Sequence, residues 1–181
     1  GRAGPEQRGN RSEAAPGAAL NSMPVYHAPT ILGGFGISWT SDRLLATFLP
    51  GDARMFAETQ RAEAPRWVLR LANDVARHLA GDLQDFSALA LPFVELSPFR
   101  QRVLHALQAI PAGQTSTYGE VAAFLGSPGA SRAVGQAVAR NPYPLVVPCH
   151  RVLAAGGRVG GFSAPGGTST KLVLLAIEKA C

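Results

Sequence analysis

Cysteine is scarce in this chain of 181 residues, since only Cys149, in the second half, and Cys181, at the very end, occur. Two such cysteines do not form a disulfide framework, and we therefore expect a protein that resides in the reducing interior of a cell. The four histidines are scattered, and no cysteine cluster accompanies them. The sequence thus predicts no metal site, because a structural zinc ion needs about four Cys or His ligands.

Long hydrophobic runs are missing as well, because no stretch approaches the roughly 20 apolar residues that a membrane helix needs. Residues 1–22 contain almost no large apolar side chain, which predicts a disordered tail and no signal peptide. Hydrophobic residues make up 46% of the chain and charged residues 16%, as in a globular protein. We expect no membrane partner and a cytoplasmic, nucleoid-associated location, or a nuclear one if the source is eukaryotic.

Charge is unevenly divided between the two halves. Residues 97–181 hold eight basic and two acidic residues, a net charge of +6, whereas residues 1–96 hold nine basic and ten acidic residues, a net charge of −1. The second half is therefore the one that would attract a polyanion. A basic half also fits an ordinary solvated surface, so charge alone does not decide the partner.

The first half has the pattern of a small mixed module, which we place at residues 23–95. Residues 35–40 and 43–49 predict a β-hairpin around the turn Ser41-Asp42. Apolar residues recur at helical spacing over residues 65–80, and residues 89–95 could form a third strand. No polar cluster in this module suggests chemistry, and we expect it to act as a scaffold.

The second half, residues 96–181, predicts a mostly helical domain. A helix begins at Ser97-Pro98, and the capping-box pattern from Thr117 to Glu120 opens a short second helix. With a further helix at 130–140 this predicts a helix-turn-helix. A glycine-rich loop at 156–167 lacks the context of a phosphate loop, and we expect a mobile loop closing over a pocket. A last helix is predicted over 168–180.

The helix at 130–140 has two different faces. Val134, Ala137 and Val138 fall on an apolar face together with Ala133. The opposite face is basic but small, which would let the helix approach an anionic surface closely. Its residues are Arg132, Gly135, Gln136, Ala139 and Arg140. An ordinary amphipathic helix with a solvated basic face remains the alternative.

The main chemical signal lies at Cys149. The apolar run at residues 145–147 predicts a buried strand that Pro148 stops, so that a turn presents the thiol beside His150 and Arg151. Nearby cations and a base favour the nucleophilic thiolate. Neighbours in sequence point apart, so thiol and imidazole must meet through a bent turn or a bridging water. The alternative is that Cys149 is a small buried apolar residue.

A carboxylate that orients His150 would complete a Cys-His-acid arrangement. Only Glu120 and Glu178 occur in this half, and Glu120 already serves the predicted cap. We therefore expect Glu178 to take this role, the alternative being a solvated charge at a helix end.

The motifs Tyr118-Gly-Glu120, Arg132-Ala-Val-Gly135, Asn141-Pro142 and Pro148-Cys-His-Arg-Val152 together resemble the O6-alkylguanine-DNA alkyltransferases. The resemblance covers residues 97–180 in motif order and spacing, and residues 25–95 only in outline. It implies an α+β fold with a ribonuclease H-like first module, which contains a short antiparallel sheet. A winged-helix-like domain with the helix-turn-helix follows.

The resemblance also implies the reaction. The protein would bind double-stranded DNA in the minor groove, flip out an O6-alkylguanine (or an O4-alkylthymine), and transfer the alkyl group once and irreversibly to Cys149. His150 would act as base through water with Glu178 orienting it, Asn141 would hold the turn, and Tyr118 would help rotate the base and donate to the guanine oxygen. Arg132 would fill the vacated stack. No cofactor is implied, and we expect a monomer.

The remaining implied roles concern contacts. The DNA-binding residues would be Ser131, Arg132, Ala133, Gly135, Gln136 and Arg151. The backbones of Cys149 and Val152 and the side chain of Ser163 would bind the guanine, with Pro144 and Phe162 as apolar walls. The chain departs from its relatives in a longer loop after Gly161, in His105 at a common tryptophan position, and in lacking the zinc ligands that some of them carry.

Two other functions remain open at this point. A non-catalytic lesion-binding or regulatory DNA-binding protein would use the helix-turn-helix and make Cys149 incidental. A cysteine hydrolase would use Cys149 and His150 but would not explain the basic, small-residue helix.

Overall fold

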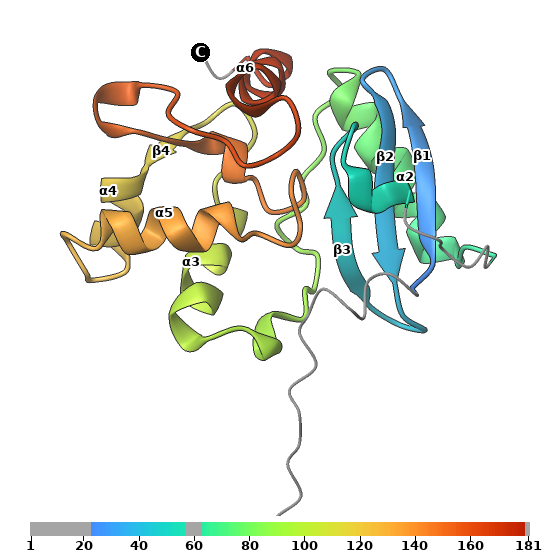
Figure 1. The fold of residues 1–181 in the computed structure, drawn as a ribbon, viewed down its shortest axis with the longest axis horizontal. Helices are drawn as coiled ribbons and strands as arrows, with labels where there is room; N and C mark the ends of the chain where they lie inside the picture. Colours follow the sequence, from blue (N-terminus) through green and yellow to red (C-terminus); the bar gives the residue numbers. More distant parts are fainter. Residues whose placement is uncertain (1–22, 57–62, 180–181) are drawn as a thin grey trace, which may run out of the picture.

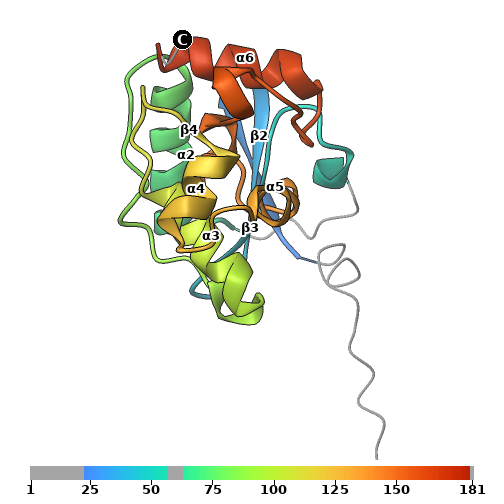
Figure 2. The ribbon, with the colours of Figure 1, turned by 90° about the vertical axis from the view of Figure 1, so that its left-hand side faces the viewer.

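The computed structural model describes residues 23–56 and 63–179, and the predicted tail 1–22 and Cys181 lie outside this part of the chain. Two modules lie side by side in Figure 1, a sheet with one long helix and a group of four helices. Seen from the side, the last helix lies at the top of the molecule (Figure 2). The combination of a small antiparallel sheet and helices confirms the α+β class.

The first module is a three-stranded antiparallel sheet in the order β1 (Val25–Thr30), β2 (Gly33–Trp39) and β3 (Leu44–Phe48). The hairpin predicted around Ser41-Asp42 is confirmed as the β2–β3 pair. Helix α2 (Arg66–Leu79) confirms the amphipathic prediction, since its buried residues recur at helical spacing and it packs against β1 and β2. A short 3-10 helix, η1 (Ala53–Phe56), follows β3.

The strand predicted at residues 89–95 is wrong. This segment ends in a 3-10 helix, η2 (Phe93–Glu95), which follows Pro92. The third strand is instead β1, which the sequence pattern missed because it contains Pro29. Proline has no N–H to donate, and β1 lies at the edge of the sheet, where proline is tolerated. The Phe93 ring meets His105 edge-on with centroids 4.6 Å apart, so His105 packs against the residue that opens η2.

The second module contains the predicted helices. Helix α3 spans Pro98–Gln108, α4 spans Tyr118–Phe124, α5 spans Ser131–Ala139 and α6 spans Gly167–Ile177. The two-residue strands β4 (Ser116–Thr117) and β5 (Val152–Leu153) pair in parallel, and 3-10 helices lie at η3 (Cys149–Arg151) and η4 (Ala155–Gly157). The capping box is confirmed, since Thr117 and Glu120 each bind the other's backbone N–H.

Residues 145–147 are buried as expected, but they do not form a strand. They form a tight turn with a single bridge between Pro144 and Val147, and Leu145 has a φ of +74°. A left-handed backbone is costly for a bulky residue, so the surrounding structure must hold this turn in place.

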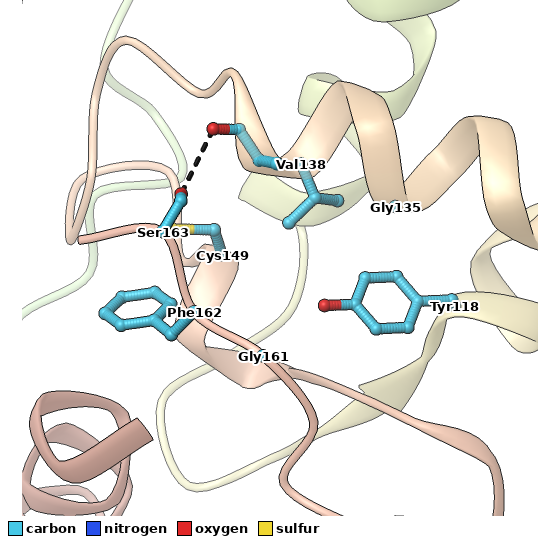
Figure 3. Close-up of a pocket in the computed structure, with 8 residues that line it drawn as sticks. Tyr118, Gly135, Val138, Cys149, Gly161, Phe162 and Ser163 are labelled. Carbon is cyan, nitrogen blue, oxygen red and sulfur yellow. Dashed lines mark hydrogen bonds between the residues drawn. The ribbon is translucent and has the colours of Figure 1, made fainter. Parts of the chain in front are cut away.

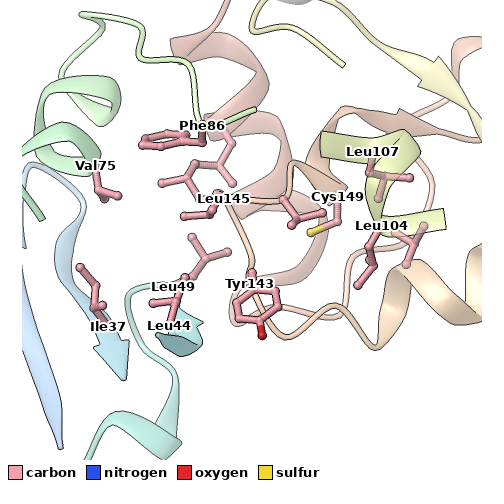
Figure 4. Close-up of a cluster of buried hydrophobic side chains, with 14 of the residues drawn as sticks. Ile37, Leu44, Leu49, Val75, Phe86, Leu104, Leu107, Tyr143, Leu145 and Cys149 are labelled. Carbon is pink, nitrogen blue, oxygen red and sulfur yellow. The ribbon is translucent and has the colours of Figure 1, made fainter. Parts of the chain in front are cut away.

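One continuous hydrophobic core runs through both modules (Figure 4). Ile37 and Val75 line it on the sheet side, Leu104 and Leu107 on the helical side, and Cys149 lies beside the last two. The predicted boundary at residues 95–96 therefore divides sequence patterns but not the core. No described helix is both long and apolar enough to cross a membrane.

Candidate active site

Cys149 is the first residue of η3, and it is 7% exposed. Asn141 holds the turn that precedes it: its Nδ2 donates to the Val147 carbonyl oxygen at 2.8 Å, and its Oδ1 accepts from the Tyr143 N–H at 2.9 Å. Burial raises the pKa of the Cys149 thiol, while a hydrogen bond with Asn141 and the charge of Lys171 act in the opposite direction. The site thus holds a shielded thiol with groups that favour its ionised form.

A cavity of about 290 Å³ opens onto this thiol (Figure 3). It lies between α5, the start of α4 and the loop after β5. Its lining residues are Tyr118, Gly135, Val138, Ala139, Cys149, Gly161, Phe162 and Ser163. The Tyr118 hydroxyl points into it (Figure 3), and burial, followed by the negative charge of Cys149, raises the pKa of this tyrosine.

Two of the predicted pocket residues, Pro144 and Val152, are absent from the lining of this cavity. Pro144 borders a neighbouring cavity of about 670 Å³ between the modules, which also reaches Cys149. The Ser163 hydroxyl donates to the Ala139 carbonyl oxygen at 3.1 Å, and both residues line both cavities (Figure 3). Val152 is fully buried and outside the lining of either cavity.

Glu178 is the C-cap of α6 and is 2% exposed, so the alternative of a solvated charge is wrong. Its Oε1 lies 2.9 Å from His150 Nε2, 2.9 Å from His78 Nε2 and 2.8 Å from the Arg151 guanidinium, which also donates to Oε2. Burial alone would raise the pKa of Glu178, but these hydrogen bonds outweigh it and hold the pKa far below its usual range.

The ionised carboxylate fixes the tautomer of His150. A carboxylate only accepts hydrogen bonds, so the hydrogen of the neutral imidazole is on Nε2. Nδ1 then carries the lone pair, and it is buried with no hydrogen-bond partner among the described residues. Burial lowers the pKa of His150, although Glu178 opposes this shift. The ring is therefore a neutral base at neutral pH.

Lys171 has no exposed side-chain surface, and sequence reasoning counted it only as part of the basic half. Its Nζ donates to the Val152 carbonyl oxygen at 2.6 Å and lies 6.0 Å from the ring centroids of both Tyr118 and Phe162. Burial lowers the pKa of Lys171, and the charge of Cys149 opposes the shift. This cation is therefore buried behind two lining residues of the cavity, Tyr118 and Phe162, and does not lie on the surface.

Helix α5 separates into the two predicted faces with one difference. Val134, Ala137 and Val138 are buried, whereas Ala133 is exposed with Arg132 and Gln136. Ala133 is therefore part of the exposed face, where the family resemblance places it. Ser131 and Gly135 are half-buried.

The prediction of Arg151 as a DNA contact does not fit its position. The side chain is buried, is bound to Glu178 and donates to the Ile110 carbonyl oxygen. Arg151 therefore stabilises the carboxylate in the interior.

Comparison with known proteins identifies the family. A sequence model described as 6-O-methylguanine DNA methyltransferase, DNA binding domain, matches residues 98–180. The methylated-DNA–protein-cysteine methyltransferase of Mycobacterium leprae is 40% identical over 160 residues, 87% of this chain and 90% of its own length. The chain belongs to this methyltransferase family. A constitutive member from Bacillus subtilis is 36% identical over 84% of this methyltransferase and 93% of its own length.

Solved structures agree with this membership. The crystal structure of Mycobacterium tuberculosis OGT in complex with DNA matches with a TM-score of 0.69 and 32% identity, over 88% of this methyltransferase and 93% of that chain. The O6-methylguanine-DNA methyltransferase from Pyrococcus kodakaraensis matches with a TM-score of 0.56 and 26% identity, over 87% and 98% of the two chains.

Sequence reasoning missed two residues of the first module that reach the site of this methyltransferase. His78 contacts Glu178, which lies 100 residues further along the sequence, and Thr47 of β3 contacts Pro144, which lies 97 residues further along. Neither lies in a motif, and only the tertiary fold brings them there. Among the described residues, no group of three or more His, Cys, Asp or Glu side chains is arranged so that it could hold a metal ion.

Proposed function

We propose that this methyltransferase repairs O6-alkylguanine in double-stranded DNA by direct reversal, taking the alkyl group irreversibly onto Cys149. The observation that carries this proposal is the placement of the thiol at the base of a cavity beside helix α5. Tyr118 borders the same cavity, and His150 follows the thiol directly in sequence. The cavity thus combines a nucleophile with a hydrogen-bond donor for a leaving group.

The reaction would proceed by in-line displacement. His150 Nδ1 takes the thiol proton through a bridging water, and the resulting imidazolium is stabilised by ionised Glu178. The thiolate forms a bond with the alkyl carbon, and the bond between that carbon and guanine O6 breaks. The electron pair stays on O6, which accepts a hydrogen bond from the Tyr118 hydroxyl. The thioether cannot regenerate the thiol, so each molecule acts once without a cofactor.

For Cys149 to reach the alkylated base, the nucleotide would have to be flipped out of the duplex. Helix α5 presents Arg132 to solvent next to the small residues Ala133 and Gly135, which allow close approach in the minor groove. Arg132 would occupy the vacated stack, while Tyr118 helps to turn the nucleotide. Flipping costs a few kcal/mol and is cheapest for poorly paired bases, which would help to select the lesion. Ser131 and Gln136 would contact the backbone.

The pocket would recognise the flipped guanine on several sides. The backbones of Cys149 and Val152 and the Ser163 hydroxyl would bind its polar edge, and Phe162 would pack on it. The ammonium group of Lys171 fixes the backbone at Val152 by binding its carbonyl oxygen, and it lies 6.0 Å from the centroid of the Phe162 ring. Asn141 keeps the turn in place through its two hydrogen bonds.

We also propose a fold for each module, an oligomeric state and a cellular location. The β1–β3 sheet with α2 supports a ribonuclease H-like module at 23–95, and α4–α5 with the β4–β5 pair supports a winged-helix-like domain at 96–181. We expect a monomer that acts on DNA in the cytoplasm or nucleus.

One experiment tests the reaction. The protein is incubated with a duplex oligonucleotide carrying O6-methylguanine, and the intact protein and its Cys149 peptide are weighed. We expect a gain of one methyl group on Cys149, which Cys149→Ala abolishes. Unmodified protein bound to the lesion would instead indicate a lesion-binding protein, and repeated turnover of an ester would indicate a cysteine hydrolase.

A further inference from the structure

His78 is a buried histidine of the first module, in the last turn of α2, and it is 1% exposed. Its Nδ1 accepts from the Gln84 backbone N–H at 3.0 Å, and its Nε2 lies 2.9 Å from Glu178 Oε1. Because Nδ1 is occupied as an acceptor, the hydrogen of the neutral ring is on Nε2 and is donated to the carboxylate. The contact therefore has a defined direction.

We propose that His78 is a positioning residue, through which the first module holds Glu178 in register with His150 and sets the basicity of His150. The inference rests on the proposed role of His150 as the base. It differs from the scaffold role expected for this module, because a side chain of α2 shares one carboxylate oxygen with the reacting histidine.

Glu178 needs such donors. It caps the C-terminus of α6, where the helix dipole disfavours a negative charge, and it is buried. The groups that face it are His78 from α2, His150 and Arg151 from η3. The other side of the His78 ring meets Phe86, with centroids 5.5 Å apart. Removal of one donor thus leaves a more basic carboxylate with two remaining donors.

The consequence for His150 has a definite sign. When His78 no longer withdraws charge from Oε1, the carboxylate stabilises the His150 imidazolium more strongly, so the pKa of His150 rises. A protonated ring cannot accept the thiol proton. The acidic limb of the rate profile should therefore move to higher pH.

The test uses free O6-benzylguanine, which reports on the transfer step without DNA binding. Rate constants are measured across the pH range for the wild type, His78→Phe, His78→Gln and the control His105→Phe, a histidine that packs outside the site. We expect His78→Phe to shift the acidic limb upward by about half a pH unit or more, which corresponds to about one third of the wild-type rate or less at pH values on that limb. His78→Gln retains a donor and should keep the wild-type limb, as should His105→Phe.

A uniform rate loss at every pH in His78→Phe, or no change, would show a structural role and overturn the inference. A wild-type rate without an acidic limb would instead remove the proposed role of His150 as base. A second measurement needs no variant: the imidazole nitrogen signals of the wild type should show His78 protonated at Nε2. A hydrogen on its Nδ1 would contradict the inference even if the phenylalanine variant failed to fold.

Discussion

The Thr47 hydroxyl donates to the Pro144 carbonyl oxygen at 2.8 Å, and its backbone N–H donates to the Pro142 carbonyl oxygen at 3.1 Å. Strand β3 therefore holds the turn that leads to Cys149, which also contains Leu145 in a left-handed conformation. The first module thus braces a turn that would be strained on its own.

Thr47→Val should destabilise the protein by about 1–2 kcal/mol, because it leaves the buried Pro144 carbonyl without its donor. The transfer rate should fall severalfold with it, since the turn positions the thiol. Urea unfolding and single-turnover kinetics measure the two effects. Thr115→Val, at an exposed threonine, serves as the control and should change neither. Wild-type stability and rate in Thr47→Val would show that the turn holds itself.

Lys171→Met should weaken the nucleophile. The ammonium group is the cation whose charge lowers the pKa of Cys149, so its loss should raise that pKa and reduce the thiolate fraction about tenfold for each pKa unit. The folded protein is treated with iodoacetamide at a series of pH values, and the extent of alkylation is measured on the peptide that contains Cys149. Lys179→Met, at an exposed lysine just beyond the C-terminal end of α6, is the control. An unchanged alkylation profile would contradict a role for Lys171 in ionising the thiol.

The stability of the protein should fall on mild acidification. Because burial lowers the pKa of His150, the unfolded chain binds a proton more readily than the folded one, so stability rises with pH up to the ordinary histidine pKa. Below about pH 6.5, each pH unit should cost up to about 1.4 kcal/mol for this group. Urea unfolding between about pH 8 and pH 5 measures this. Stability that stays constant across this window would show that His150 accepts a proton in the fold without cost.

Local sequence patterns predicted the elements whose signals are themselves local. The capping box at Thr117 and Glu120, the amphipathic α2 and the β2–β3 turn depend on neighbours within a few residues. The motif around Cys149 was found because its chemistry is unusual in any context. Edge strand β1 and the turn at Leu145 were missed, since proline and tertiary contacts overrode the expected pattern.

The sequence predicted the candidate site in two cases only. Cys149 and His150 are neighbours in sequence, and Glu178 was the one acidic residue of the second half without another predicted role. Glu178 was named because the half contains one other glutamate, and the structure places it against His150. His78, Thr47 and Lys171 could not be named, because their roles arise from burial and from contacts made by the fold. The role of Arg151 as a DNA contact, which the family resemblance implied, does not fit the structure for the same reason, because the fold buries its side chain.

Substitution of Arg132 should separate DNA binding from the alkyl transfer step. Its side chain is exposed on α5 and is absent from the lining of the cavity at Cys149, so it should act on the duplex and not on the thiol. Arg132→Ala should slow repair of O6-methylguanine in duplex DNA by about tenfold or more, because the base would then leave the stack with no side chain to fill its place. Reaction with free O6-benzylguanine should stay close to the wild-type rate. Arg158→Ala removes an exposed arginine of the same basic half and should lower both rates little. Equal losses on both substrates in Arg132→Ala would show that Arg132 supports the cavity instead of opening the base stack.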